Sequence, residues 1–458
     1  MNRVQHGDWR TRSLWTECNP YEPMGHLRGS EIADIVIVGA GFTGLWSAIQ
    51  LKEADPAIDV VVCEAKVAGY GASGRNGGFA MTMVGRSLAD LVRKVGPGRA
   101  RATHLAMRDT LKEIEKFCIA EGINAAISAP GLLTVSNAPE QDARIASDLR
   151  AAERLGLDDF HPQSAAQCQQ LVASTRLRCG HFEDDALLVD PAALCWGLRD
   201  AARRRGVRIY EQTPVDALVE TGSGRVEART AFGTVLADRA LVATNAYAHS
   251  IKPLRRFIFT VYAYIVVTEP LSDTQWSRVG WEKRMGIEDK RVMPHFHRPT
   301  PDGRILWGGR DAPIAPGGPN PRRDRSRYVF RRLEESFRWT FPQLCDVAID
   351  RGWGGPVCGT LNCFSSVGFL GPSERICYAL GYAGHGVGQS HLAAKVVRDL
   401  LLDANSELLE LPIARKPPIP LPPEPLRSWV LTGSQRLLQR DDDGARTALS
   451  RLALRILE

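Results

Sequence analysis

The sequence predicts an α/β protein with two domains, and three observations support this fold class. At 458 residues the chain exceeds the size that a single hydrophobic core usually serves. A β-branched run at 35–38 leads through a glycine-rich turn into apolar residues with helical spacing, which is typical of a parallel sheet covered by helices. Alternating segments between 256 and 310 indicate long antiparallel strands instead. We expect one domain with a parallel sheet and a discontinuous α+β domain built on an antiparallel sheet.

The first glycine-rich turn has the pattern GxGxxG, formed by Gly39, Gly41 and Gly44. It lies between a strand and a helix, and Glu64 follows twenty residues after Gly44 at the end of a second apolar strand. The first glycine permits the turn, the second lets a pyrophosphate approach, and the third lets the helix pack on the strand. The helix N-terminus adds partial positive charge. The pattern predicts a Rossmann-like dinucleotide site in which Glu64 binds ribose hydroxyls, and a purely structural turn is the alternative.

The stretch GASGRNGG at 71–78 helps to choose among dinucleotides. The carboxylate of Glu64 would repel a 2′-phosphate, which disfavours NADP. An NAD enzyme would normally continue with another crossover helix, whereas a bare glycine loop suits FAD, whose reactive ring lies far from its adenosine. We expect the loop amides to hold phosphate, and Arg75 and Asn76 to lie near the flavin ring or the substrate. A surface salt bridge is the alternative for Arg75.

The middle of the chain returns to the parallel sheet. A strand reaches Val215, and a hairpin within 224–248 ends in a buried strand at 240–244. Cofactors of α/β proteins bind outside the carboxyl ends of parallel strands. We therefore expect Thr244 and Asn245 at the cofactor.

A second strand, glycine loop and helix occur late in the chain. The strand Ile376–Leu380 is followed by GYAGHGVG at 381–388 and then by a helical pattern. The N-terminus of this helix could face N1 and the C2 oxygen of a flavin, where negative charge collects on reduction. His385 lies between the glycines of this loop, and we expect it to act electrostatically or by positioning. A structural loop is the alternative.

The segment MPHFHR offers two further histidines, His295 and His297. On a strand they share one face while Phe296 points to the other. One face could present two imidazoles to a substrate, or Phe296 could form part of an aromatic wall; histidines at the solvent edge are the alternative. Anionic substrate groups are also possible partners for arginines, namely Arg75, Arg298 and Arg310.

Composition excludes several functional classes. The net charge of +6, from 58 basic and 52 acidic residues, is mild and does not favour a nucleic-acid partner. Ten cysteines without zinc spacing indicate reduced thiols and no metal site. The polar N-terminus has no secretory pattern, and no apolar run is long enough for a membrane span. We expect a cytoplasmic protein, and the sequence leaves its oligomeric state open.

The domains are predicted to be discontinuous in sequence. The first, cofactor-binding domain takes 12–90, 175–255 and 350–410, the substrate domain takes 91–174 and 256–349, and a Pro-rich linker with a helical C-terminal tail takes 411–458. We expect the tail to pack on the body or on a partner subunit rather than on a membrane.

Several motifs together resemble those of one enzyme family. They are DIVIVGAGFTGL, GASGRNGGF, GRILWGGR, RGWGGPV and GYAGHGVGQS, and in this order they resemble the FAD-dependent oxidoreductases of the D-amino-acid oxidase superfamily. The likeness spans residues 12–405 and is strongest to gamma-glutamylputrescine oxidases and other amine-oxidising members. It implies bound FAD and oxidation of a C–N bond in a small amine or amino acid.

The resemblance also implies which residues contact the cofactor. The residues expected to contact the ADP half of FAD are Gly39, Gly41, Phe42, Thr43, Gly44, Glu64, Ala65 and Val215. Those for the pyrophosphate and the flavin are Ala72, Ser73, Gly74, Arg75, Asn76, Gly77, Gly78, Thr244, Asn245, Gly381, Gly384, His385, Gly386, Val387 and Gly388. The candidate catalytic residues are His385, His297, His295 and Arg75.

Two positions depart from the sarcosine oxidases within this superfamily. Gly388 stands where those enzymes have a lysine near the flavin, so here the helix dipole and the backbone would stabilise the reduced ring. Cys358 lies near the position of their FAD-linking cysteine but one residue out of register. We therefore expect non-covalent FAD, with Cys358 as a small buried hydrophobe.

The implied reaction transfers a hydride equivalent from the α-carbon of a neutral amine to flavin N5. The imine then hydrolyses to an aldehyde or keto acid, and the electrons pass to O₂ to give H₂O₂. The first alternative is a dehydrogenase that passes electrons to a quinone or another carrier. A flavoprotein acting on modified RNA is a second alternative, and a catalytically silent flavoprotein is a third.

Overall fold

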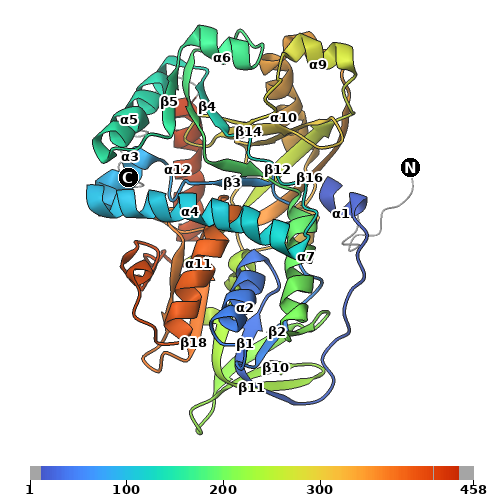
Figure 1. Cartoon of the computed structure of the whole chain (residues 1–458), viewed down its shortest axis with the longest axis vertical. Coiled ribbons are helices and arrows are strands. Elements are labelled where there is room, and N and C mark those ends of the chain that lie inside the picture. Colours follow the sequence, from blue (N-terminus) through green and yellow to red (C-terminus); the bar gives the residue numbers. More distant parts are fainter. Residues whose placement is uncertain (1–11, 416, 443–458) are drawn as a thin grey trace.

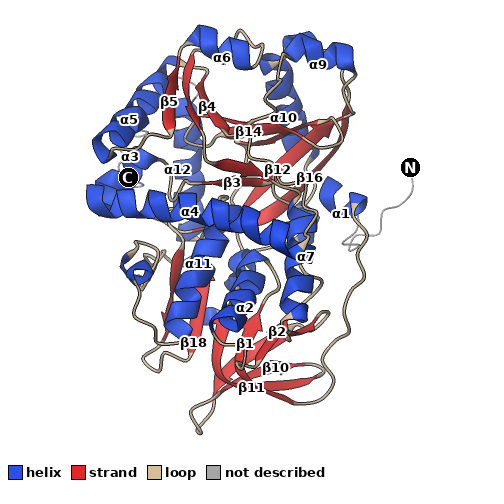
Figure 2. Ribbon diagram, in the orientation of Figure 1, coloured by secondary structure: helices blue, strands red, loops and turns tan. Residues whose placement is uncertain are grey.

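The computed structural model describes residues 12–415 and 417–442. Two large sheets lie one above the other along the longest axis of the molecule (Figure 1). Helices pack against both sheets, and the long helix α4 (Pro97–Glu121) crosses the molecule between them (Figure 2). This arrangement agrees with the predicted α/β class and its two sheets.

The first sheet has the order β17-β18-β11-β1-β2-β8. Its core strands β18, β11, β1, β2 and β8 are parallel, while β17 runs antiparallel at one edge. In this order the strands are Ser366–Leu370, Ile376–Leu380, Gly233–Val242, Glu31–Val38, Val60–Cys63 and Arg208–Tyr210. A hairpin of β9 (Val215–Glu220) and β10 (Val226–Thr230) extends it beside β11.

Three helices pack against one another on this sheet. They are α2 (Phe42–Ala54), α7 (Pro191–Arg204) and α11 (Gly386–Leu401), with α2 between the other two. The end of β1 and all of β2 are buried, because helices cover one face and the hairpin region the other. This burial explains why both strands are runs of β-branched residues without alternation.

The second sheet has the order β16-β12-β15-β14-β13-β4-β6-β5. The strands are Ile349–Gly359, Phe259–Thr268, Ile305–Gly309, His295–Pro299, Gly286–Asp289, Leu132–Ser136, Cys179–Glu183 and Phe160–Gln163. Neighbouring strands are antiparallel except β13 and β4, which are parallel. Helix α10 (Arg327–Thr340) covers one face, and the other face is turned toward the first domain.

Two strands lie outside the domain boundaries that the sequence predicted. β16 pairs along its length with β12, and β6 pairs with β4 and β5, so both belong to the second sheet although 175–255 and 350–410 were assigned to the first domain. Helix α4, assigned to the substrate domain, packs on α11. The sequence pattern shows that a segment is a strand, but not which of two sheets it joins.

The remaining elements connect these layers. The helices are α1 (Leu14–Cys18), α3 (Leu88–Val95), α5 (Pro139–Leu155), α6 (Ala165–Leu171), α8 (Lys252–Arg255), α9 (Asp273–Val279) and α12 (Leu426–Asp442). The strands β3 (Phe79–Met81) and β7 (Ala186–Leu188) form a small antiparallel pair. Residues 443–458 of the predicted tail lie outside the described part of the chain. Within that part, no helix is long and apolar enough to span a bilayer.

Candidate cofactor and substrate site

The first glycine turn is tightly packed by the protein itself. Gly39 has a φ of +107°, and a Cβ there would lie 2.8 Å from the carbonyl oxygen of Ala243. A Cβ on Gly44 would fall on the carbonyl oxygen of Gly39. These two glycines therefore let α2 pack directly against the end of β1, as the GxGxxG pattern predicts.

The middle glycine of this turn faces the second loop instead. A Cβ on Gly41 would lie 2.9 Å from Oγ of Ser73, and the amide of Phe42 donates to the same oxygen at 3.0 Å. Gly41 is also the N-cap of α2 and has no side chain to satisfy the first amides of the helix. The structure thus brings the start of α2 and the 71–78 loop together.

Glu64 lies just beyond the end of β2. Its carboxylate accepts hydrogen bonds from the amides of Ala40 and Lys66, each at 2.9 Å. Burial raises the pKa of Glu64 to about 7. The amide of Thr213 donates to its carbonyl oxygen at 2.8 Å, which brings the start of β9, and with it Val215, to the same edge of the sheet.

The 71–78 loop is stabilised by one of its own side chains. The amide group of Asn76 donates to the carbonyl oxygens of Ala72 and Ser73, and its oxygen accepts from the amide of Gly78 at 2.7 Å. A Cβ on Gly77 would lie 2.8 Å from the ring of Phe296. The side chain of Asn76 therefore shapes the loop.

Arg75 is buried between the two domains. Its Nη1 donates to the carbonyl oxygen of Gly354 at 3.2 Å and to Asp324 at 3.1 Å. Arg12 forms an ion pair with the same carboxylate. The surface salt bridge considered for Arg75 is thus replaced by a buried one, in which two guanidinium groups share one carboxylate.

The second glycine turn joins β18 to α11. His385 is the N-cap of the helix, and its side chain makes no capping bond. Burial lowers its pKa to about 4, so the imidazole is neutral near pH 7. Gly384 has a φ of +99°, and a Cβ there would meet no heavy atom within 4 Å, so this turn is open. The hydroxyls of Tyr382 and Thr43 lie 2.8 Å apart and connect the two turns.

Several buried polar atoms in these segments have no hydrogen-bond partner among the described residues. They are Arg75 Nη2, Thr244 Oγ1, Asn245 Oδ1 and His385 Nδ1. The parallel strands β1, β11 and β18 end on the same side of the sheet, next to the turns that carry three of these atoms. Buried polar groups normally find partners. These residues therefore fit a large polar cofactor such as FAD, which would supply the missing partners.

The opposite wall of the site is the inner face of the second sheet. Phe296 points to this face and packs on Phe79, with ring centroids 5.7 Å apart. His297 points to the other face, where it stacks on Trp307 at 4.1 Å and contacts Phe341 edge-on. Phe296 therefore forms the wall, and the two imidazoles do not.

The positions of His295 and His297 correct the expectation that they serve as catalytic groups. His295 is buried and shares a hydrogen bond with Asp289 at 3.1 Å. Burial lowers the pKa of His297 to about 3. Both rings are packed into the core beneath α10, because the even-numbered residues of β14 face the first domain.

Arg298 is a structural residue rather than a partner for an anionic substrate. It is 2% exposed and donates to the carbonyl oxygens of Gly78 and Val189 at 3.1 and 2.9 Å. Burial lowers its pKa to about 10. Its side chain holds the 71–78 loop against the second sheet.

Comparison with known proteins identifies the family. The model of a family described as FAD dependent oxidoreductase matches residues 34–400. The chain belongs to this family. It is 33% identical over 392 residues to gamma-glutamylputrescine oxidoreductase of Escherichia coli K12, covering 84% of this chain and 87% of that one. It is 29% identical over 387 residues to the probable oxidoreductase OrdL of Haemophilus influenzae, covering 82% and 85%.

Solved structures show the same fold. The glycine oxidase of Geobacillus kaustophilus aligns with a TM-score of 0.70 at 18% identity, over 84% of this chain and 99% of that chain. The L-proline dehydrogenase of P. horikoshii aligns with a TM-score of 0.69 at 17% identity, over 84% and 96%. The family match makes the protein an FAD-dependent oxidoreductase, and FAD is its cofactor.

Cys358 of this FAD-dependent oxidoreductase lies in β16 and is fully buried. It packs in an apolar cluster with Tyr378 and Leu380. Burial raises the pKa of its thiol to about 12, so the reactive thiolate is strongly disfavoured.

No pattern in the sequence indicates a group of ionisable residues that the fold gathers at the inner face of the second sheet. They line a cavity beside the site and include His104, Asp148, His181, Glu183, Glu288 and Lys290. These residues come from α4, α5, β6, β13 and the turn after β13, spread over almost two hundred positions. No spacing in the sequence links them, so only the fold brings them together.

Proposed function

We propose that this FAD-dependent oxidoreductase oxidises a C–N bond of a small amine or amino acid and passes the electrons to O₂, which gives H₂O₂. The observation that carries the proposal is that unpartnered polar atoms of the 71–78 loop, of Thr244–Asn245 and of the second glycine turn lie opposite an apolar wall. The 33% identity to an enzyme named for gamma-glutamylputrescine supports an amine as the substrate.

The first domain would hold the cofactor. The start of α2 at Gly41 and the loop around Ser73 would bind the pyrophosphate, and Glu64 would bind the ribose hydroxyls. The start of α11 at Gly386 would place its amides at the pyrimidine edge of the flavin. When bound, FAD supplies an acceptor for the hydride equivalent that leaves the carbon next to the substrate nitrogen.

Residues of the second domain would prepare the substrate. Phe296, Ile265 and Trp353 are apolar side chains of the inner face and would exclude water from the reacting carbon. A dry site disfavours the ammonium form of an amine, and only the neutral amine can release a hydride. The imidazole of His385 is neutral and could accept a hydrogen bond from the substrate through Nδ1.

We also propose that FAD is bound without a covalent bond. The buried, apolar position of Cys358 supports this assignment. Precipitation of the yellow protein with acid should release all of the flavin into the supernatant. Flavin that stays with the precipitate would contradict the proposal.

An anaerobic titration tests the proposed reaction. A panel of small amines and amino acids is added to the oxidised protein, and one of them should bleach its visible flavin absorption. Readmission of air should restore the colour and produce one H₂O₂ for each amine oxidised. If the colour returns only with a quinone or another carrier, the protein is a dehydrogenase, and if no amine bleaches it, the proposed reaction is wrong.

A further inference from the structure

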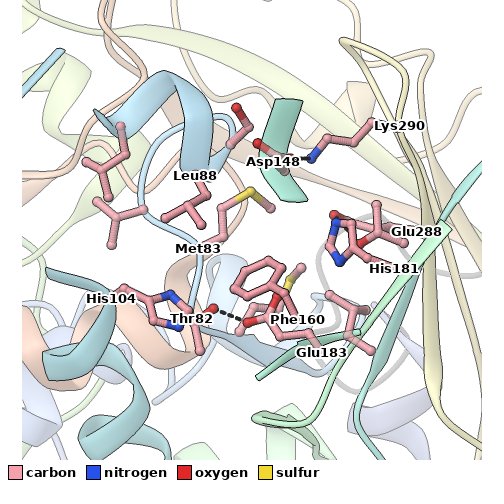
Figure 3. A pocket seen from close by; sticks show the side chains of 16 residues that line it. Thr82, Met83, Leu88, His104, Asp148, Phe160, His181, Glu183, Glu288 and Lys290 are labelled. Carbon is pink, nitrogen blue, oxygen red and sulfur yellow. Dashed lines mark hydrogen bonds and ion pairs between the residues drawn. The ribbon is translucent and has the colours of Figure 1, made fainter. Parts of the chain in front are cut away.

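A small cavity lies directly beside the proposed flavin site. Residues 81–84, which continue from the 71–78 loop, form one side, and the inner face of the second sheet forms another (Figure 3). Gln389 of α11 donates to the carbonyl oxygen of Met83 at 3.0 Å. A Cβ on Gly388 would lie 3.2 Å from the carbonyl oxygen of Met81. The cavity thus borders the start of α11.

Three ionisable side chains point into this cavity from the second sheet. Glu288 and His181 stand in register on either side of Thr134, on the strands that flank β4. Glu183 lies two residues beyond His181 on the same strand and the same face. Figure 3 shows all three directed toward the same space, with His104 on its far side.

The other charges around the cavity are already paired. Lys290 forms an ion pair with Asp148 at 2.5 Å. Asp159 hydrogen-bonds to His104 at 2.7 Å and lies 3.8 Å from Arg108. The charge of Lys290 also lowers the pKa of Glu183 and of Glu288, but its ion pair is with Asp148, and it forms none with either glutamate.

Glu183 and Glu288 have only hydroxyl partners. Within the described part of the chain neither carboxyl forms an ion pair; Thr82 donates to Glu183, and Thr134 donates to Glu288 at 3.4 Å. Both are more than nine-tenths buried. Burial raises the pKa of Glu183 to about 8 and that of Glu288 to about 7. A buried carboxyl without a cation is costly, and a bound cation would relieve that cost.

His181 supplies an independent indication of a ligand. It is 3% exposed and lines the cavity, yet both of its ring nitrogens lack a hydrogen-bond partner among the described residues. Burial lowers its pKa to about 4, so the ring is neutral and offers one nitrogen as an acceptor. A cation that enters the cavity would favour loss of the carboxyl protons to solvent, and two carboxylates with a neutral imidazole are then all acceptors, which match a group with several N–H donors.

We propose that this cavity binds a second ammonium group of the substrate, held by Glu183, Glu288 and His181. The inference rests on the proposed function and narrows its substrate class to amines that carry another positive charge. Strand β14, which carries Phe296, is two strand spacings from β4, about 10 Å. A short diamine extended across β13 would therefore have one amine beside the flavin loop and the other in the cavity.

A metal ion fits the cavity less well. His104, Asp159 and Glu183 offer donor atoms within 4.8 Å of one another. However, Asp159 is already bonded to His104, and the guanidinium of Arg108 beside it would repel a divalent cation. The acceptors that remain are spread over two strands, which suits hydrogen bonds to an ammonium group better than a compact coordination sphere.

Matched substrates test the proposal. Diaminobutane, aminobutanol and butylamine have the same chain and differ only in their second end group. The KM of diaminobutane should be at least about tenfold lower than that of aminobutanol or butylamine. Neither of these two has a second ammonium group to form charged hydrogen bonds in the cavity. If the protein oxidises butylamine as well as diaminobutane, the proposal is wrong while the proposed function stands.

Two variants and a control locate the effect. Glu183→Gln and Glu288→Gln should each raise KM for diaminobutane about tenfold or more and leave KM for butylamine unchanged. Glu335→Gln, an exposed site on α10, is the matched control and should change neither. An equal change for both amines would indicate a structural role and overturn the proposal.

A binding measurement separates the two proposals if no amine is oxidised. Calorimetry with the FAD-loaded protein should show diaminobutane binding that is lost in Glu183→Gln, even without turnover. If diaminobutane does not bind to the FAD-loaded protein, the proposed cation site is wrong. Stoichiometric metal in the purified protein, removed by a chelator together with diamine binding, would also overturn it in favour of a metal site.

Discussion

The two walls of the proposed site are built in different ways. The wall from the first domain is backbone: at Gly39, Gly44 and Gly78 the chain passes so close that a Cβ would meet a carbonyl oxygen. The wall from the second domain is made of side chains, with Phe296 beside the loop and Glu183 and Glu288 farther along the sheet. A cofactor common to the family can be held by backbone, whereas a particular substrate needs particular side chains.

The difference also appears within the first wall, between its two glycine turns. A Cβ at Gly44 would collide with the protein, while one at Gly386 would have the side chain of Tyr382 as its nearest neighbour at 3.5 Å, an ordinary contact. Gly44 is therefore needed for folding. Gly386 is free of such a demand, and the proposed cofactor explains why this position carries no side chain.

The largest effect is expected from Gly44→Ala. The added methyl group would fall on the carbonyl oxygen of Gly39 and push α2 off the first sheet. We expect a loss of about 3 kcal/mol in the free energy of unfolding, as in severe overpacking, and protein that retains little FAD. Thermal unfolding and flavin absorbance measure both effects. Gly98→Ala, on the first turn of α4 with no atom within 4 Å, is the control and should remain stable.

A pH-dependent effect on stability is expected from Glu183→Gln. In the folded protein burial raises the pKa of Glu183 from its ordinary value of 4.5 to about 8. The folded protein therefore keeps this proton at pH values where the unfolded chain has lost it. Unfolding therefore releases a proton between these values, and stability falls as the pH rises through this window. The amide cannot ionise, so the variant should be more stable than the parent at pH 8 and equal to it at pH 4.5.

Chemical denaturation at several pH values checks this expectation in the absence of any amine. A constant difference between Glu183→Gln and the parent at all pH values would show that the carboxyl is not held protonated by burial. Saturating diaminobutane should remove the advantage of the variant, because the ammonium group stabilises the ionised carboxylate in the parent.

A smaller effect, confined to the cofactor, is expected from Gly386→Ala. The methyl group has room in the folded chain, so the melting temperature without cofactor should stay close to that of the parent. It would project from the start of α11 where the flavin is proposed to lie. We expect weaker binding of FAD and a shifted flavin spectrum. Unchanged FAD affinity in this variant would show that the open turn does not face the cofactor.

The smallest effect is expected from His297→Phe. The ring stacks on Trp307 in the core of the second domain, and phenylalanine preserves its shape. The pKa of His297 is already lowered to about 3, so its loss should leave the pH profile of kcat/KM unchanged. If the pH profile of the variant lacks an ionisation near neutral pH that the unmodified protein shows, His297 takes part in the reaction.

The sequence predicts the backbone wall well because steric demands are local. GxGxxG, its flanking strand and helix, and the strand Ile376–Leu380 before the second turn all have the predicted form. The orientation of the segment MPHFHR could not be predicted from the sequence. Strand alternation shows that Phe296 and the two histidines lie on opposite faces, but not which face is turned toward the first domain. The cavity residues carry no local pattern, because strand pairing alone places Glu288 next to Thr134 and His181.

The C-terminal helix α12 contacts both domains. Near its start, Arg427 donates to the carbonyl oxygen of Arg255, close to the first sheet. At its end, Asp442 pairs with Arg144 and accepts from the amides of Val292 and Met293, the turn that leads into β14. The helix thus connects the region of the first sheet to the second sheet. A chain cut before residue 426 would lose the contacts that hold the turn ahead of Phe296, so a segment far from the GxGxxG motif in the sequence helps to position the wall opposite the expected flavin.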